Sequence, residues 1–187
     1  TEEMIRQKLL PAGVDVDYRW NFKKHDTWHY SDRGWTFLRW AVVENKPKLV
    51  QYLVEKGAKI DATYHKHRGM LPMEWAINEG MTDVAKALAS KQKIDLTLTK
   101  SKDGLSLAEL LIEKIGDAHT LEFFLGSVPD AAKRKSLFVF SAKNGKLNAL
   151  KVLAPCDGRE KESWAEEALK GQVDKNAVQW LKDCKLK

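Results

Sequence analysis

Histidine and cysteine are the side chains in this sequence that most readily support metal binding or catalysis. His25 and His29 are four residues apart, and His65 and His67 are two apart. A metal site needs at least a third protein ligand at fixed geometry, and no third ligand accompanies these pairs. We therefore expect ordinary surface histidines, and no metal or other cofactor.

The cysteines give no stronger sign of chemistry. Cys156 and Cys184 have no histidine near them in the sequence, and two cysteines are too few for a disulfide framework or a four-cysteine zinc site. The sequence contains neither a glycine-rich phosphate loop nor a nucleophile elbow. It therefore predicts a protein that is not an enzyme.

Composition narrows the class further. The chain has 187 residues, of which 43% are hydrophobic and 31% charged, so it is expected to fold. No apolar run approaches the roughly 20 residues of a membrane-spanning helix, and no signal segment follows Thr1. We expect an intracellular monomer, in cytoplasm or nucleus, that is a piece of a longer chain.

The sequence repeats itself at a spacing of 35 residues. Gly34, Gly69 and Gly104 begin the similar stretches G-W-T-F-L-R-W-A-V-V-E-N, G-M-L-P-M-E-W-A-I-N-E-G and G-L-S-L-A-E-L-L. Apolar residues recur at helical spacing within them, as in L-V-Q-Y-L-V at 49–54, and the glycine after such a helix suits a left-handed C-cap. Helices this short bury too little apolar surface alone, so the repeats must stack.

These stretches resemble the ankyrin repeat, whose pattern is roughly G-x-T-P-L-H-x-A-A-x-x-G-H-x-x-I-V-x-x-L-L-x-x-G-A-D-V-N. Leu49 to Asp61, ending in G-A-K-I-D, is close to its second half. The resemblance implies an all-α fold, a solenoid of helix–turn–helix units with protruding hairpin or loop fingers. It implies a single domain, 1–187, of five to six divergent repeats. The predicted parts are a partial repeat, 1–17; a long aromatic and basic finger, 18–33; repeats 34–68, 69–103, 104–135 and 136–160; and a degenerate C-terminal cap, 161–187.

The positions of the family's Thr-Pro-Leu-His tetrapeptide depart from the pattern. They are 36–39, 71–74 and 106–109, where no repeat keeps the histidine and only one keeps the proline. In the family, the threonine and histidine join neighbouring turns by hydrogen bonds. We therefore expect part of this bonding to be lost, while the conserved pattern of apolar positions keeps the shape.

The resemblance also implies where a partner binds, because ankyrin partners usually contact the fingers and the first helices. The finger 18–33 holds five aromatic residues, which form either a contact surface or a local cap on the first repeat. The fingers 18–33, 59–68, 93–103 and 129–135 have net charges of +2, +2, +1 and +2, against +6 for the whole chain. Such a basic edge attracts acidic partners.

The candidate partner-binding residues combine these basic side chains with large apolar ones. A large apolar residue follows each finger glycine, at a position that is usually exposed in the family. A second row, Trp40, Trp75, Leu110 and Phe140, packs either in the core or, if partly exposed, along the floor of a groove. The full set is Trp28, Trp35, Met70, Leu105, Lys23, Lys24, Lys66, Arg68, Lys100, Lys102, Trp40 and Trp75.

The sequence thus predicts a non-catalytic protein-interaction module that binds an acidic and apolar segment of a partner. Two alternatives stay open. The basic edge could bind nucleic acid or anionic lipid headgroups directly, although its lysines are spread over several fingers without an RNA- or DNA-reading motif. The chain could also be the targeting segment of a larger enzyme, channel or effector, since its first repeat is incomplete.

Overall fold

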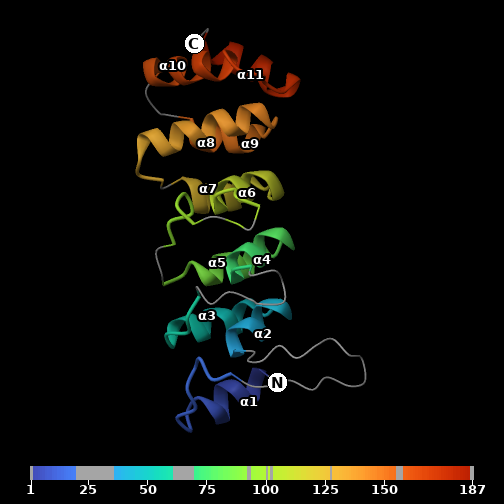
Figure 1. The fold of residues 1–187 in the computed structure, drawn as a ribbon, viewed down its shortest axis with the longest axis vertical. Coiled ribbons are helices and arrows are strands. Elements are labelled where there is room, and N and C mark those ends of the chain that lie inside the picture. Colours follow the sequence, from blue (N-terminus) through green and yellow to red (C-terminus); the bar gives the residue numbers. More distant parts are fainter. Residues whose placement is uncertain are drawn as a thin grey trace. The chain divides into compact units, whose positions relative to one another are not determined.

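In this computed structural model, helices joined by turns make up the described part of the chain (Figure 1). The helices group into two compact units, Thr1–Asp95 (unit 1) and Leu96–Lys187 (unit 2). The all-α repeat architecture is confirmed, whereas the single array over 1–187 and its repeat boundaries remain predictions. The structure describes residues 2–19, 36–60, 70–91, 94–99, 101, 103–126, 128–154 and 158–185.

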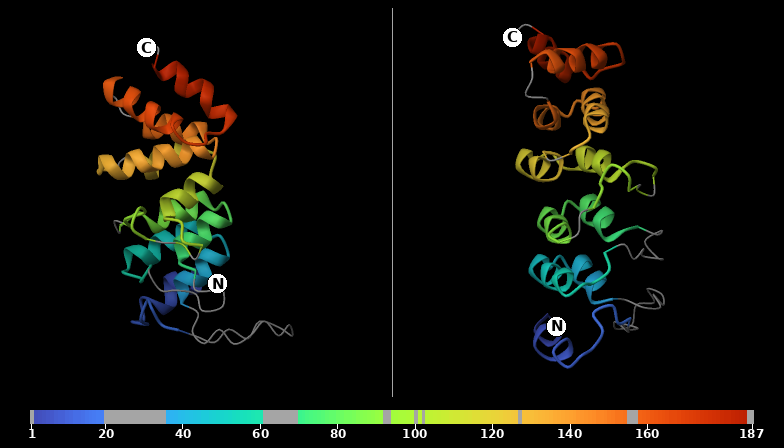
Figure 2. Two further views of the ribbon diagram at one scale, coloured as in Figure 1. Left: turned by 45° about the horizontal axis from the view of Figure 1, so that its top comes forward. Right: turned by 90° about the vertical axis from the view of Figure 1, so that its left-hand side faces the viewer.

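Unit 1 is built from short helices that pack in pairs (Figure 2). Helix α2 packs on α3, and α4 packs on α5. The two pairs also contact each other, α2 against α4 and α3 against α5, as expected for stacked repeats. The elements are α1, Glu2–Met4; a π-helix, η1, Ile5–Leu9; α2, Phe37–Val43; α3, Pro47–Glu55; α4, Pro72–Asn78; and α5, Thr82–Leu88.

Unit 2 continues the same pairing with longer helices towards its end. Helix α6 packs on α7, α8 on α9 and α10 on α11, while α7 contacts α9 and α8 contacts α10. The elements are α6, Leu107–Lys114; α7, Ala118–Leu125; α8, Ala131–Lys143; α9, Leu147–Leu153; α10, Gly158–Leu169; and α11, Lys175–Lys185.

Polar side chains begin several helices by accepting a backbone hydrogen bond in the first turn. The Thr36 hydroxyl accepts from the N–H of Arg39 at 3.1 Å, and the Asp117 carboxylate accepts from the N–H of Thr120 at 2.8 Å. Asp130 starts α8 in the same way. Each such cap satisfies a backbone donor that the helix itself leaves unpaired, and contributes about 1 kcal/mol.

Glutamate replaces the family's histidine in two repeats and forms capping bonds within its own repeat. The Ser106 N–H donates to the Glu109 carboxylate at 2.7 Å, and the Ser106 hydroxyl accepts from the Glu109 N–H at 3.2 Å. The Leu71 N–H donates to the Glu74 carboxylate at 3.3 Å. The departures from Thr-Pro-Leu-His therefore exchange imidazole bonding for bonds that close the start of α6 and α4.

The apolar helix faces predicted from the sequence form the core of each unit. Leu49, Val50, Leu53 and Val54, on one face of α3, are at most 2% exposed. Equivalent side chains of α7 and α9 are buried in unit 2. The burial of these side chains supplies the apolar contact that holds each repeat against the next.

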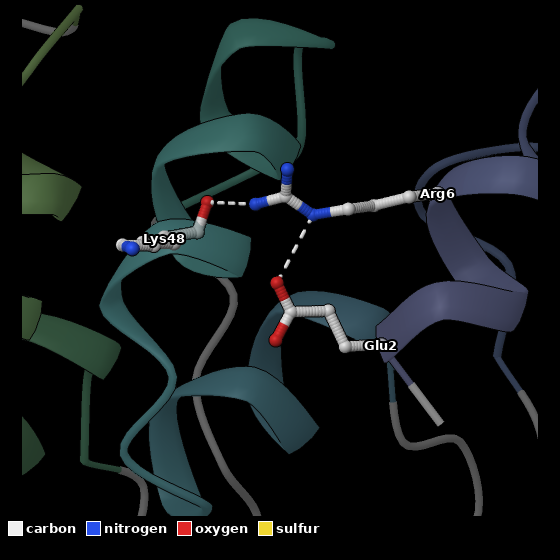
Figure 3. A network of polar contacts seen from close by, with 3 residues as sticks. All are labelled: Glu2, Arg6 and Lys48. Carbon is white, nitrogen blue, oxygen red and sulfur yellow. Dashed lines mark hydrogen bonds and ion pairs between the residues drawn. The ribbon is translucent and has the colours of Figure 1, made fainter.

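The N-terminal segment is attached to α3 by one arginine (Figure 3). The Arg6 guanidinium donates to the Lys48 carbonyl at 2.6 Å and pairs with the Glu2 carboxylate at 3.1 Å. It also lies over the Tyr52 ring, 4.8 Å from its centroid, and the Lys56 ammonium lies 5.6 Å from the same ring. The partial repeat is therefore part of unit 1 rather than a separate tail.

Candidate partner-binding surface

Four of the twelve candidate residues lie in the described part of the chain. Trp40 and Trp75 are on α2 and α4, Met70 stands just before α4, and Leu105 stands just before α6. The remaining candidates lie outside the described residues: Trp28, Trp35, Lys23, Lys24, Lys66, Arg68, Lys100 and Lys102.

Trp40 and Trp75 are the fourth residues of two neighbouring helices. The Trp40 N–H donates to the Thr36 carbonyl at 3.1 Å, and the Trp75 N–H donates to the Leu71 carbonyl at 2.9 Å. Each indole therefore stands one turn inside its helix, at the same position of α2 and α4, which pack against each other. Stacking in register places the two tryptophans along one face of unit 1.

The exposure of this row of residues differs between the two units. Trp40 and Trp75 are both partly exposed, so they do not belong to the closed core. In unit 2, Leu110 is buried at 3% exposure, whereas Phe140 is partly exposed. The core interpretation therefore holds for Leu110, and the aromatic members of the row reach the surface.

Met70 and Leu105 are also partly exposed. Each immediately precedes the N-cap residue of a helix, Leu71 for α4 and Ser106 for α6. The Leu105 carbonyl accepts from the Ser101 N–H at 2.6 Å, and the Gly104 N–H donates to the Ser101 carbonyl at 3.0 Å. These bonds close the described part of the third finger into a compact loop. Unit 1 therefore has a partly exposed Met70 just before α4, and unit 2 has a partly exposed Leu105 just before α6.

The fourth predicted finger, 129–135, is not a finger. Its residues from Ala131 onward are the first turns of α8, which begins at the Asp130 cap. The Arg134 guanidinium donates to the carbonyls of Leu153 at 2.8 Å, Val152 at 2.7 Å and Gly126 at 3.1 Å. Arg134 thus bonds the C-terminal carbonyls of α9 and α7 and is part of the fold of unit 2.

The next residue of this basic run is also engaged within unit 2. The Lys135 ammonium lies 2.6 Å from the Glu167 carboxylate and so joins α8 to α10. The hydrogen bond from Lys135, and then its charge, hold the pKa of Glu167 below its ordinary value. The segment 129–135 therefore drops out of the predicted basic edge, and the other three fingers, 18–33, 59–68 and 93–103, remain a prediction because their candidate basic residues lie outside the described residues.

Two exposed acidic residues were overlooked by counting charge in the fingers alone. Glu44 and Glu79 follow Trp40 and Trp75 by four residues, and both are exposed. The sequence signal was present as W-A-V-V-E and W-A-I-N-E, 35 residues apart. Because residues four apart share a helix face, each tryptophan has a carboxylate one turn beyond it.

Other kinds of site find no support within the described ranges. No group of three histidine, cysteine, aspartate or glutamate side chains there could hold a metal ion. None of the helices described is long and apolar enough to cross a membrane.

Short helix pairs with a left-handed residue in the connecting turn, stacked in register, define a helical-repeat protein. The left-handed residues are Asn45, Gly80 and Gly145, with φ of 51°, 67° and 65°. The sequence model described as "Ankyrin repeats (3 copies)" matches residues 4–100, just over half of the 187-residue chain. The chain therefore belongs to the ankyrin repeat family, whose members generally act as protein–protein interaction modules and are typically non-catalytic. No curated protein matches the sequence.

Proposed function

We propose that the chain is a non-catalytic interaction module that holds an acidic and apolar segment of another protein. The single observation that carries this proposal is the presence of two partly exposed tryptophans at the same position of neighbouring helices, α2 and α4. A tryptophan that a partner covers is the kind of residue that most often dominates an interface, at about 2 kcal/mol or more each. Met70 adds a third apolar side chain at the start of α4.

The fingers that precede these helices in the sequence carry positive charge, which is opposite to that of the proposed acidic ligand. Fingers 18–33 and 59–68 lead into α2 and α4, and each has a net charge of +2. Finger 93–103 adds +1 before α6. A partner with acidic residues is attracted to such an edge, which speeds association at low salt.

Affinity capture from a native cell extract tests this proposal when four forms of the chain are compared. The first is the natural chain, and the second carries Trp40→Ala and Trp75→Ala. The third removes four finger charges by K66A, R68A, K100A and K102A, and a matched control removes four exposed lysines elsewhere by K8A, K48A, K151A and K182A. Circular dichroism before each capture verifies that every variant is folded.

We expect a set of proteins that the natural chain and the control retain, that the tryptophan variant loses, and that the finger variant binds more weakly. Elution of this set should shift to lower salt for the finger variant, because its electrostatic attraction is reduced. Retention of the same set by all four forms would overturn the proposal. Retention of random oligonucleotides, lost steeply as salt rises, would instead identify a nucleic-acid binder.

A further inference from the structure

Each of the two partly exposed tryptophans is followed by a carboxylate on the same helix face. The Glu44 N–H donates to the Trp40 carbonyl at 2.9 Å, and the Glu79 N–H donates to the Trp75 carbonyl at 3.0 Å. These bonds fix each glutamate one helical turn beyond its tryptophan, where side chains four residues apart are neighbours. The face of unit 1 thus carries the same Trp–Glu pair twice.

The two glutamates stand where helix electrostatics disfavours them. Glu44 and Glu79 are the C-cap residues of α2 and α4, and both are exposed. The C-terminal end of a helix carries partial negative charge, so lysine or arginine is the favourable residue there. Within the described residues neither carboxylate forms an ion pair that would offset this cost. A cation supplied by a partner would offset this cost in both of these successive repeats.

The corresponding positions of unit 2 lack this combination. The residues one turn beyond Leu110 and Phe140 are Lys114 and Asn144. Neither can accept a cation as a carboxylate does. The Trp–Glu pairs are therefore a property of unit 1 rather than of the repeat in general.

We infer that the pairs Trp40–Glu44 and Trp75–Glu79 each bind one lysine or arginine side chain of the partner segment. An indole face attracts a cation, and a carboxylate within reach of the same side chain adds an ion pair. This inference rests on the proposed function and deepens it: the ligand carries basic residues in addition to acidic and apolar ones. Its acidic residues face the fingers, and its basic residues face Glu44 and Glu79.

The packing of α2 on α4 sets the spacing of these basic residues. Packed helices lie about 8–10 Å apart, so equivalent positions on them are separated by about that distance. In a polyproline II helix, three residues complete one turn and advance about 9.3 Å, so side chains i and i+3 lie on the same side at that separation. The partner segment should therefore carry basic residues at positions i and i+3.

Helices α2 and α4 are short enough for one extended segment to span either of them. Helix α2 has seven residues, Phe37–Val43, and α4 also has seven, Pro72–Asn78. A helix of this length is about 10 Å long, so side chains of one extended partner segment can contact both its N-terminal and its C-terminal end. Along each helix the tryptophan is followed by the glutamate at the C-cap, so the partner's basic residues should contact the C-terminal ends of α2 and α4.

A titration followed by nuclear magnetic resonance tests the inference without knowledge of the natural partner. The probe is the blocked peptide Gly-Lys-Pro-Pro-Lys-Gly, and the readout is the indole N–H signals of Trp40 and Trp75. Those signals are assigned from W40F and W75F, and the full chain is used throughout. A second peptide with glutamine in place of both lysines measures the contribution of the cations.

We expect the lysine peptide to shift both indole signals saturably, with little shift from the glutamine peptide. The double variant E44Q/E79Q should raise the dissociation constant about fivefold or more, because two ion-pair contributions are lost. The matched control E3Q/E55Q makes the same charge change at exposed residues of α1 and α3, and should leave the constant unchanged. All four glutamates are exposed, so folding should be retained.

Two results would overturn the inference. One is an absence of shift in both indole signals at millimolar lysine peptide. The other is an equal rise of the peptide dissociation constant in E44Q/E79Q and in E3Q/E55Q. That result would show that the overall charge of the protein, and not a local site, attracts the peptide. Either result leaves the capture of an acidic partner through the fingers unaffected, so failure here is distinct from failure of the proposed function.

Discussion

Gly145→Ala is the substitution for which the structure gives the sharpest expectation. Gly145 lies in the turn between α8 and α9 with φ of 65°, and a Cβ atom there would stand 2.6 Å from Oδ1 of Asp174. Asp174 lies just before α11, and its carboxylate accepts a hydrogen bond at 2.8 Å from the N–H of Asn176 in the first turn of that helix. Alanine at 145 therefore meets two separate penalties, one in its backbone and one against a neighbouring loop of unit 2.

The two penalties can be weighed separately. A left-handed backbone costs a residue other than glycine about 1–2 kcal/mol. Carbon contacts are favourable at about 3.5–4.0 Å, so Asp174 must move by roughly 1 Å or more. That movement gives up its capping bond, which is worth about 1 kcal/mol. We expect G145A to destabilise unit 2 by about 2–3 kcal/mol.

Urea unfolding followed by far-ultraviolet circular dichroism measures this loss. G104A is the matched control in the same unit, because Gly104 has φ of 82° and nothing within 4 Å of an added Cβ. It should cost only the backbone penalty, about 1–2 kcal/mol. The double variant G145A/D174A completes a thermodynamic cycle, because D174A removes Oδ1 and Cγ, the two atoms that a Cβ at position 145 would approach to 2.6 and 2.7 Å, and leaves only the Cβ of residue 174 at 3.2 Å.

In the D174A background, G145A should cost about as much as G104A does in the natural chain. The double variant should therefore be more stable than the sum of its single variants by about 1 kcal/mol. If G145A and G104A destabilise equally, or if the cycle is additive, the close approach of the α8–α9 turn to Asp174 is refuted.

Three further predictions concern charged groups within the units. R134M should destabilise unit 2 by about 2–3 kcal/mol in urea unfolding, because three carbonyls lose a charged donor, and R134K should recover part of the loss. An R134M variant as stable as the natural chain would contradict the role of Arg134. Because Lys135 lowers the folded-state pKa of Glu167 below its ordinary value of 4.5, the stability it adds should be present above about pH 4.5 and lost as pH falls towards the folded pKa. The difference in urea midpoint between the natural chain and E167Q should therefore shrink on acidification, and a constant difference would contradict this. Arg39 and Glu74, at 5% and 2% exposure, occupy the same position of the packed helices α2 and α4. We predict that the effects of R39M and E74M on the free energy of unfolding are coupled by about 1 kcal/mol or more in a double-mutant cycle. Strictly additive effects would contradict an interaction between these two side chains.

Much of the fold could be predicted from the sequence because the repeat pattern depends on residue types at short, fixed spacings. The apolar face at 49–54 is buried as predicted, since its spacing admits only one buried side of a short helix. The start of α6 was also readable in principle, because Ser106 and Glu109 have the spacing of a capping box. Comparison with the family pattern noted only that Glu109 stands where the family has histidine. The reciprocal capping bonds between Ser106 and Glu109 were therefore not predicted.

The basic run at 133–135 shows where sequence interpretation failed. Three adjacent basic residues between two repeats suggested an exposed finger, because charge is usually solvated. The structure places them in α8, where Arg134 bonds the ends of α7 and α9 and Lys135 pairs with Glu167. Those partners are 8 to 32 residues away in sequence, so no local pattern indicates them.

The sequence by itself determined the repeat, the family and the buried faces of the helices. It did so because each depends on residue type at a fixed short spacing, which survives the loss of Thr-Pro-Leu-His. Only the tertiary structure decided which members of the aromatic row reach the surface and that Arg134 and Lys135 bond within unit 2. Both depend on what neighbouring helices cover: Leu110 is buried, whereas Trp40 and Trp75 stay partly exposed beside Glu44 and Glu79.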